Sequence, residues 1–316
     1  MRLSDVSIVV VGSSNTDMIV TSVRIPRPGE TVLGGGFAMA AGGKGANQAV
    51  GAARAGGRVT FIGRVGRDAF GERAVRGLAA DGIDVTRVIR DAVRPSGVAL
   101  IVVARDGENS IAVAPGANAA LSAADVQASA RAFEGADIAL LQLEVPAEAV
   151  GAAVALASKK RVPVILNPAP ARRLERTLLE RVSILTPNEH EAALLAGVPV
   201  DGETSAARAA RLLRGRGVET VIITLGARGA FVAGPGFTGL VPGFKVKAVD
   251  TTAAGDIFNG ALAVAIGEGK ALPDAVRFGH AAAAVSVTRL GAQPSAPSRR
   301  VIDRFLRERS KEVSHG

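Results

Sequence analysis

Residues 162–196 read VPVILNPAPARRLERTLLERVSILTPNEHEAALLA, and this stretch decides the fold class. Its two apolar runs, 162–167 and 182–186, are short and rich in β-branched residues, as buried strands are. Each run is followed by a segment with the apolar spacing of a helix, at 174–181 and 188–196. Strands that alternate with helices in this way predict an α/β protein with a mainly parallel sheet covered on both faces.

The same alternation extends along most of the chain. Further expected strands lie at 6–11, 59–63, 137–143 and 220–226, and further expected helices lie at 44–56, 68–81, 122–133, 146–160 and 204–216. An antiparallel pair is expected around 229–249, before two Ala-rich helices at 254–268 and 273–289. Because no linker-like segment separates these elements, we expect a single domain, residues 1–316, with a three-layer α/β/α architecture.

Two segments break the alternation. Residues 18–38 carry prolines and a glycine cluster between strand-like pieces, and residues 97–114 contain a hairpin turn at Asp106-Gly107. We expect them to form a small β-sheet, from about 15–41 and 95–115, that acts as a lid over the site described below. An ordinary edge extension of the main sheet is the alternative.

The composition restricts the function. The chain has no cysteine, which excludes disulfides and thiolate chemistry and agrees with a reducing compartment. Its net charge of +9 would suit nucleic acid, but the arginines are dispersed over helix faces and no Trp or Tyr is present to stack on bases. No apolar run is long enough to span a membrane, and none resembles a signal peptide. We therefore expect a cytoplasmic protein that binds an anionic phosphate substrate and neither nucleic acid nor membrane.

Polar side chains follow two of the expected strands. Asn15 and Asp17 come directly after the first strand, and Glu144 ends an apolar one. Ligands of open α/β sheets bind beyond the carboxyl ends of the strands. Asn15 and Asp17 suit a polyol, because a carboxylate accepts from two vicinal hydroxyls while an amide donates and accepts. Turn formation by Asn15 and Asp17, and a helix N-terminal charge role for Glu144 before Pro146, are the alternatives.

The glycine-rich stretch AAGGKGANQAV, residues 40–50, superficially resembles a P-loop. A P-loop requires Ser or Thr after its lysine, and here Gly45 follows Lys44, so that interpretation fails. What remains is the pair Gly42-Gly43, whose missing Cβ atoms let backbone N–H groups approach a ligand, with Asn47 one turn into a helix. A plain helix start is the alternative.

The motif TPNEHEA, residues 186–192, places Asn188 and Glu191 at a strand end and helix start. Residues at i and i+3 share a helix face, so their oxygens can order the water shell of a Mg²⁺ carried by nucleotide phosphates. A capping box, with Asn188 as N-cap and Glu191 at N3, is the alternative, and both roles can hold at once.

The motif TLGARGA, residues 224–230, ends a strand at Thr224 and continues through Gly226 and Gly229. Such a loop suits contact with the phosphates or ribose of a nucleotide. Glycine turns after strands are common, so the motif is a weak indicator on its own.

The stretch VDTTAAGDIFNGALAVAIG, residues 249–267, places an acid at the start of a helix. Ala253, Ala254 and Gly255 are small enough for their backbone N–H groups to converge on an anion, with the helix dipole behind them. Asp256 would repel a bound anion, but it suits a base that accepts a proton from a hydroxyl attacking a phosphoryl group. The stretch therefore predicts a phosphotransferase with an anion hole at 253–256 and Asp256 as general base.

Eight motifs together resemble one family. In chain order they are NTD, GGKGANQAVGAARAG, QLEVP, LNPAPAR, TPNEHEA, TLGARG, VDTTAAGDIFNGALA and HAAAAVSVTRLGAQPS, between about Val9 and Phe305. Their order and spacing resemble the ribokinases of the phosphofructokinase-B-type carbohydrate kinase superfamily. The resemblance implies a ribokinase-like fold with a β-lid and ATP-dependent phosphorylation of D-ribose at its 5-hydroxyl.

The resemblance also implies roles for the matching residues. The residues implied to hold the sugar are Asn15, Asp17, Gly42, Gly43, Lys44, Asn47, Glu144 and Asp256. Those implied to meet ATP are Asn188, Thr224, Leu225, Gly226, Ala227, Arg228, Gly229, Gly255, Asp256 and His280. His280 would lie against the adenine, and a histidine packed within a helix bundle is its alternative.

Ribokinases also use a monovalent cation, usually K⁺, and their lid doubles as a dimer interface. The implied cation ligands, several through backbone carbonyls, are Asp250, Thr252, Ser286, Arg289, Gly291 and Ser295. Many members of the superfamily have Gly where this chain has Ala253. We therefore expect ATP, Mg²⁺ and K⁺ as cofactors and a homodimer formed through the lid.

Three other functions have less support. A kinase for another pentose, hexose or nucleoside would share these motifs, although an Asp17 that faces two hydroxyls favours ribose over 2-deoxyribose. A non-catalytic sugar-binding module would have no need of Asp256. A dinucleotide oxidoreductase would carry G-x-G-x-x-G after the first strand, and this chain does not.

Overall fold

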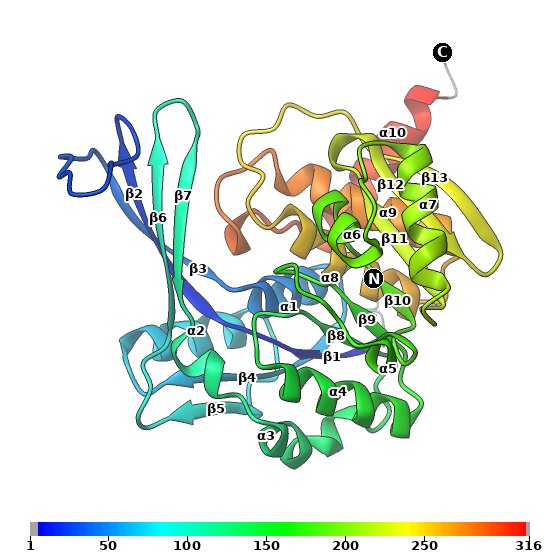
Figure 1. The fold of residues 1–316 in the computed structure, drawn as a ribbon, viewed down its shortest axis with the longest axis horizontal. Coiled ribbons are helices and arrows are strands. Elements are labelled where there is room, and N and C mark those ends of the chain that lie inside the picture. Colours follow the sequence, from blue (N-terminus) through cyan, green and yellow to red (C-terminus); the bar gives the residue numbers. More distant parts are fainter. Residues whose placement is uncertain (1–5, 314–316) are drawn as a thin grey trace.

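The computed structural model describes residues 6–313, and a nine-stranded sheet forms their centre (Figure 1). In spatial order its strands are β13 (Phe237–Pro242), β12 (Gly229–Gly234), β11 (Thr220–Thr224), β10 (Ile184–Leu185), β9 (Val164–Leu166), β8 (Ile138–Leu141), β1 (Ser7–Val11), β4 (Arg58–Gly66) and β5 (Val88–Asp91). All pairings from β11 to β5 are parallel, and β12 pairs antiparallel with both β11 and β13. The sheet is therefore mainly parallel, as predicted.

Helices cover both faces of this sheet. One face carries α3 (Ala123–Ala128), α4 (Ala147–Lys160), α5 (Arg176–Leu179), α6 (Glu189–Ala196) and α7 (Glu203–Arg214). The other carries α1 (Lys44–Arg54), α2 (Ala69–Ala80), α8 (Ala254–Gly267), α9 (Leu272–Ser286) and α10 (Arg299–Val313). Four 3₁₀ turns complete the described part of the chain, namely η1 (Gly116–Ala120), η2 (Ala130–Phe133), η3 (Gly226–Arg228) and η4 (Gln293–Ser295).

Strand β1 shows why the sheet has a core on each side. Its alternate residues Val9 and Val11 belong to the core on the α4 face, whereas Ile8 and Val10 belong to the core on the other face, which includes α1 and α8. A strand buried on both faces reads as a continuous apolar run, and β1 does. The three-layer α/β/α prediction is confirmed, while the short edge strand β5 and helix α10 were not predicted.

The second sheet has four strands and projects from the main body (Figure 1). Its order is β3 (Phe37–Gly42), β2 (Asn15–Ser22), β6 (Gly97–Ala104) and β7 (Asn109–Ala114). Strands β6 and β7 form the expected hairpin, and Gly107 in its turn has a φ of 91°. This sheet is separate from the nine-stranded one, so the alternative of an edge extension is wrong.

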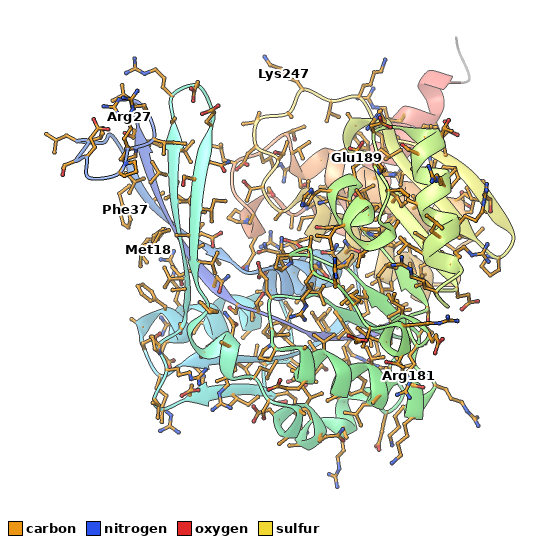
Figure 2. All side chains as sticks on the ribbon, in the orientation of Figure 1. Met18, Arg27, Phe37, Arg181, Glu189 and Lys247 are labelled. Atoms are coloured by element: carbon orange, nitrogen blue, oxygen red, sulfur yellow. The ribbon has the colours of Figure 1, made fainter. Side chains whose placement is uncertain are left out.

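The two faces of the small sheet differ in character. Because side chains alternate along β2, Asp17 and Met18 point to opposite sides. Register places Met18 beside Leu100 and Val20 beside Phe37, and Phe37 is 64% and Leu100 54% exposed. Figure 2 shows Met18 and Phe37 on the side turned away from the main body. The face opposite the site is therefore an exposed apolar surface.

Helices α1 and α8 pack in direct backbone contact on one face of the main sheet. A Cβ added to Gly260 of α8 would lie 2.5 Å from the carbonyl O of Gln48 and 2.6 Å from the N of Ala52. Both atoms belong to the backbone of α1, so they have little freedom to move away. Glycine at position 260 sets the distance between the two helices. Within residues 6–313, no helix has both the length and the apolar content needed to cross a bilayer.

We expect Gly260→Ala to lower the free energy of unfolding by about 2 kcal/mol, in the range for overpacked cores. Gly77→Ala on α2 is the matched control, because no atom lies within 4 Å of the added Cβ. In a helix interior that substitution stabilises by up to ~1 kcal/mol. Urea unfolding of both variants measures the difference, and equal stability would contradict the packing argument.

Candidate active site

The carboxyl ends of the parallel strands bring the predicted motifs to one edge of the main sheet. Asn15 follows β1, Glu144 follows β8, Asn188 follows β10, and Thr224 ends β11. Three cavities lie along this edge, and we name them after one residue of each: the Glu144, Asp256 and His280 cavities. The last two share Thr224 and Gly255 as wall residues, so they adjoin.

The Glu144 cavity has a volume of about 450 Å³ and is lined by Asn15, Val113 and Asn118 among others. The Glu144 Oε2 atom accepts hydrogen bonds from Ser13 Oγ at 2.5 Å and from the Lys44 backbone N–H at 2.9 Å. Lys44 is the first residue of α1, so Glu144 is a helix N-terminal charge. The helix concerned is α1, and not the α4 helix that follows Glu144 in sequence.

Asn118 orients Asn15, although it was not among the predicted site residues. The Asn118 Nδ2 atom donates to Asn15 Oδ1 at 2.7 Å and to the Ser14 carbonyl at 3.1 Å. Its Oδ1 accepts from the Ser14 N–H at 2.9 Å, which settles the orientation of the Asn118 amide. The donor end of Asn15 is thereby left for a ligand.

The glycine pair before α1 gives room to the polar side chains around it. A Cβ on Gly42 would lie 2.3 Å from both carboxylate oxygens of Asp17. Gly43 has a φ of 88°, and a Cβ there would lie 2.7 Å from the Asn15 nitrogen. Both positions require glycine, one for close approach and one for its backbone conformation.

Asp256 lies in the first turn of α8 and is buried. Its Oδ2 accepts from Asn47 Nδ2 at 3.0 Å, and its Oδ1 accepts from Gln48 Nε2 at 3.0 Å. Burial raises the pKa of Asp256, while Lys44 and these two amide donors act in the opposite direction. The structure thus brings Asp256 and Asn47 together, and both were predicted site residues. It also places Gln48 beside Asp256, and Gln48 was not predicted.

Four carboxylates surround the Lys44 ammonium. Burial alone would lower the pKa of Lys44, but Asp256, Glu144, Glu191 and Asp17 outweigh it and the pKa is raised. Burial, followed by the charges of Glu144 and Asp256, raises the pKa of Asp17 to about 6. The site therefore holds a charged lysine beside Asp17, Glu191 and Asp256, whose pKa values are all raised.

The expected anion hole is built around a strained residue. Ala253, the N-cap of α8, has a φ of 58°, the left-handed region in which glycine is favoured. The N–H of Ala254 donates to the Thr251 carbonyl at 3.2 Å. The hydrogen bonds of residues 6–313 include none from the N–H of Gly255 or Asp256. These two donors, rather than that of Ala254, are free to meet an anion.

Asn188 and Glu191 form the capping box that was considered for them. Asn188 Oδ1 accepts from the Glu191 N–H at 2.8 Å, and Glu191 Oε2 accepts from the Asn188 N–H at 2.9 Å. Both also line the Asp256 cavity of about 200 Å³, together with Lys44 and Asp256. The N-terminus of α6 is thus organised without a ligand, and its two acceptor side chains still face the cavity.

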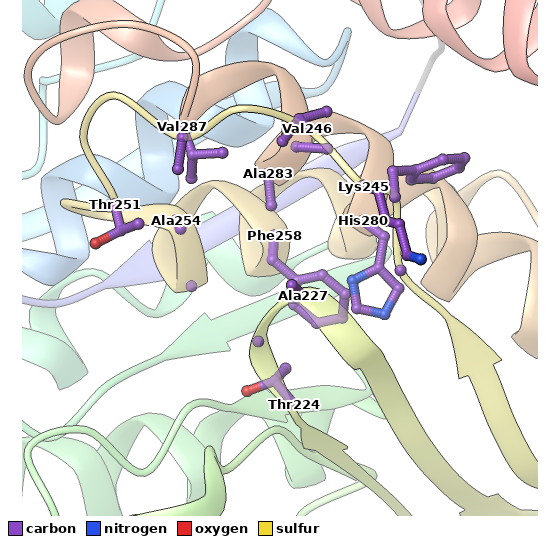
Figure 3. A pocket seen from close by; sticks show the side chains of 16 residues that line it. Thr224, Ala227, Lys245, Val246, Thr251, Ala254, Phe258, His280, Ala283 and Val287 are labelled. Carbon is purple, nitrogen blue, oxygen red and sulfur yellow. The ribbon is translucent and has the colours of Figure 1, made fainter.

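The His280 cavity has a mostly apolar lining and a volume of about 380 Å³ (Figure 3). Its wall is formed by Thr224, Gly226, Ala227, Gly243, Phe244, Lys245, Val246, Ala248, Thr251, Ala254, Gly255, Phe258, His280, Ala283, Ala284 and Val287. The small side chains of α9, Ala283 and Ala284, make room for a flat group. They belong to the motif HAAAAVSVTRLGAQPS, but neither residue was named as part of the site. A cavity of this size and lining suits a heteroaromatic ligand.

Only part of the loop 224–229 faces this cavity. Thr224, Gly226 and Ala227 line it, whereas the Leu225 side chain is buried in the core on the α4 face. The Arg228 guanidinium pairs with Glu189 and donates to the Asp201 carbonyl at 2.9 Å. Arg228 thus joins the loop to α6 and the segment before α7. Gly229 begins β12, outside the cavity lining.

His280 lies on the cavity wall beside Phe258. The ring centroids are 5.0 Å apart at 42°, and Figure 3 shows the two rings next to each other. His280 Nε2 is buried, and within residues 6–313 no hydrogen-bond partner faces it. Burial lowers the pKa of His280 to about 4. The imidazole is therefore neutral at physiological pH and presents a polar atom to an otherwise apolar wall.

Two of the other expected cation ligands, Thr252 and Gly291, contact Asp250. Its Oδ1 accepts from the Thr252 N–H at 2.9 Å, and its Oδ2 accepts from the Gly291 N–H at 2.8 Å. The N–H groups of Val249 and Asp250 donate to the Val287 carbonyl, which follows Ser286. The segment 249–252 thus meets residues 287 and 291, and the oxygen groups in these contacts are the Asp250 carboxylate and the Val287 carbonyl. Oxygen atoms are the donor type that hard cations prefer. Ser295 is buried nearby in sequence, in η4.

A family model described as pfkB family carbohydrate kinase matches residues 5–299. The chain belongs to this family, so the resemblance drawn from the eight motifs is confirmed.

Its relatives include proteins named ribokinase. The chain is 46% identical over 300 residues to the ribokinase of Haemophilus influenzae, covering 95% of this chain and 98% of the relative. A solved structure of Arabidopsis thaliana ribokinase complexed with ribose and ATP matches with a TM-score of 0.89 and 34% identity, covering 96% of this chain and 99% of that one. A deoxyribokinase of Salmonella typhi is 37% identical, with 95% and 98% coverage.

The depressed pKa of His280 predicts acid lability. Its folded pKa of about 4 lies below the ordinary 6.5, so between these values the unfolded chain binds one more proton. The contribution of neutral His280 to the free energy of unfolding is complete above about pH 6.5 and is lost as the pH falls towards 4. From pH 7 to pH 5 the wild type should lose about 2 kcal/mol more than His280→Leu, which cannot titrate. Urea unfolding at both pH values tests this, and identical losses would contradict a buried neutral imidazole.

Proposed function

We propose that this protein transfers the γ-phosphoryl group of ATP to the 5-hydroxyl of D-ribose, giving D-ribose 5-phosphate and ADP. The position of Asp256 carries the proposal. This carboxylate lines a cavity that adjoins the apolar His280 cavity on one side, and it interacts with Glu144 and Asp17 on the other. A hydroxyl and a triphosphate that entered from these two sides would meet at Asp256.

The chemical step then follows from the residues around Asp256. Asp256 accepts the proton of the 5-hydroxyl as its oxygen forms a bond to the γ-phosphorus, and the bond to the leaving oxygen of ADP breaks. The N–H groups of Gly255 and Asp256 and the Lys44 ammonium stabilise the charge on the transferring group. The raised pKa of Asp256 suits a base that must both take up and release a proton.

The sugar would occupy the Glu144 cavity beneath the small sheet. Asp17 offers two free carboxylate oxygens to vicinal hydroxyls, and Asn15 offers the N–H groups that Asn118 leaves unused. The adenine would occupy the His280 cavity, with the loop 224–229 along the phosphates. Closure of the small sheet over the sugar would exclude water from the reaction.

Magnesium and potassium complete the proposal. Asn188 and Glu191 would hold the water shell of a Mg²⁺ that, when bound, neutralises phosphate charge. The segments at 250–252 and 286–295 would hold K⁺, which would stabilise the N-terminal turn of α8 next to the anion hole. Asp250 is suited to this because burial raises its pKa less than its hydrogen bonds to Thr252 and Gly291 lower it, so it stays ionised.

We also propose a cytoplasmic homodimer that associates through the small sheet. The outer face of this sheet exposes Val20, Phe37 and Leu100 together. Contiguous exposed apolar side chains favour association, and a second copy of the same face would cover them.

The first test is ADP release in the presence of ribose, 2-deoxyribose, fructose and adenosine, with and without KCl. We expect turnover with ribose and K⁺ to exceed the others. Asp256→Asn should still bind ribose and ATP, while its kcat falls by ~10² to 10⁴-fold, the usual contribution of a positioned base. Glu219→Gln, at an exposed carboxylate, is the control and should retain wild-type turnover. Deoxyribose as the preferred substrate would overturn the sugar assignment, and an active Asp256→Asn would overturn the base.

The raised pKa of Asp17 predicts pH-dependent sugar binding. Only the ionised carboxylate accepts from two hydroxyls, and its pKa is about 6 in the free protein. The Kd for ribose, measured by calorimetry without ATP, should be about tenfold weaker at pH 5 than at pH 7. Asp17→Asn should bind ribose more weakly and lose this dependence. A wild-type Kd that is constant between pH 5 and pH 7 would exclude Asp17 as the titrating acceptor.

A further inference from the structure

Resting on the proposed function of Asp256 as base, we propose that Gln48 is a positioning residue for the Asp256 carboxylate. We also propose that Gln142 and Asn167 determine which end of the Gln48 amide faces it. None of these three amides was among the predicted site residues. The argument depends on the direction of each hydrogen bond.

The direction is set at a backbone carbonyl. Asn167 Nδ2 donates at 3.0 Å to the carbonyl of Thr186, which can only accept. The oxygen of the Asn167 amide must therefore face the other way, and it accepts from Gln48 Nε2 at 3.1 Å. This assigns the NH₂ end of Gln48 without reference to Asp256.

The same NH₂ group donates its second hydrogen to Asp256 Oδ1 at 3.0 Å. The Gln48 Oε1 atom then points away from Asp256 and accepts from Gln142 Nε2 at 2.6 Å. The side-chain amides of Asn167, Gln48 and Gln142 form a series of hydrogen bonds that starts at the Thr186 carbonyl, and each amide is oriented by the one before it. If the Gln48 amide were reversed, its oxygen would face a carboxylate oxygen and favour the protonated acid.

Burial makes this orientation important. Gln48 and Gln142 are completely buried, and Asp256 and Asn167 are nearly so. With water excluded, the carboxylate depends on protein donors to remain ionised, and the donors available to it are Asn47 and Gln48. The other charged groups that act on Asp256 are Lys44, Glu144, Asp17 and Glu191. Within residues 6–313, the side-chain hydrogen bonds of Gln48 go to Asn167, Asp256 and Gln142 and to none of these charged groups.

Gln142, the last amide in this series of hydrogen bonds, indicates that the arrangement has an energetic cost. Gln142 Oε1 is buried and has no hydrogen-bond partner within residues 6–313. It lies against Gly12, where an added Cβ would be 2.1 Å away. An unpaired buried oxygen is unfavourable, so its presence is explained if the opposite end of the amide has a required task. That task is donation to Gln48.

The test is the pH profile of kcat at saturating ribose and ATP, where titration of Asp17 does not contribute. Gln48→Met keeps the side-chain length and removes the donor. We expect the acid-side apparent pKa of kcat to rise by about one unit, so that kcat falls about tenfold at pH values below the wild-type apparent pKa. At pH 9 kcat should recover, and both KM values should stay within about threefold of wild type.

Gln142→Met is the second variant, since it touches neither Asp256 nor any cavity named above. It should move the same apparent pKa in the same direction, by less. Gln127→Met makes the same substitution at an exposed position of α3 and should leave the profile unchanged.

Loss of activity in Gln48→Met that is equal at every pH, or an unchanged apparent pKa, would overturn the positioning role. A shift in Gln48→Met without one in Gln142→Met would overturn the orienting chain. Failure of the proposed function is a separate result, because it appears as turnover by Asp256→Asn or as no ribose-dependent ADP release by the wild type.

Discussion

The backbone contact between α1 and α8 is the constraint on which the active site depends. At the start of helix α1, the Lys44 N–H donates a hydrogen bond to Glu144. One turn later, the side-chain amides of Asn47 and Gln48 donate hydrogen bonds to Asp256 of α8. These bonds span a short distance that Gly260 permits. The N–H groups of Gly255 and Asp256 also lie in the first turn of α8. This one helix contact therefore links Glu144 with the proposed base and the proposed anion donors.

The charge balance of the site explains why it needs both substrates. Asp17, Glu144, Glu191 and Asp256 face one ammonium, that of Lys44. Burial, with a smaller effect from neighbouring carboxylates, raises the pKa of Asp17, Glu191 and Asp256. Hydroxyl groups donate to these acids, and a phosphate with its metal ion changes the balance again. The free site is therefore electrostatically incomplete, and the ligands supply the groups that it lacks.

The sequence predicted those features that depend on local pattern. The apolar runs around 162–196 placed strands and helices correctly because their periodicity is local, and the position of Asp256 at the start of α8 followed from its neighbours. The partners of Asp256 were only half predicted. Gln48, Gln142 and Asn167 are ordinary polar residues in their own segments, and only the fold makes them converge. The short strand β5, the pairing of Asn118 with Asn15 and the left-handed backbone of Ala253 likewise arise from tertiary contacts.

Because side chains alternate along β2, the register of this strand determines both which residues face the site and which form the exposed apolar surface. Asn15 and Asp17 face the site, whereas Met18 and Val20 face the exposed apolar side, so the two sets occupy alternate positions of this strand. A single-residue insertion or deletion between β1 and β2 would exchange the two sets, turning a carboxylate outward and a thioether inward. Length variation in this linker is therefore expected to be rare among functional versions of the chain, whereas the loop between Ser22 and Phe37, beyond the end of the strand, can change length without altering that parity.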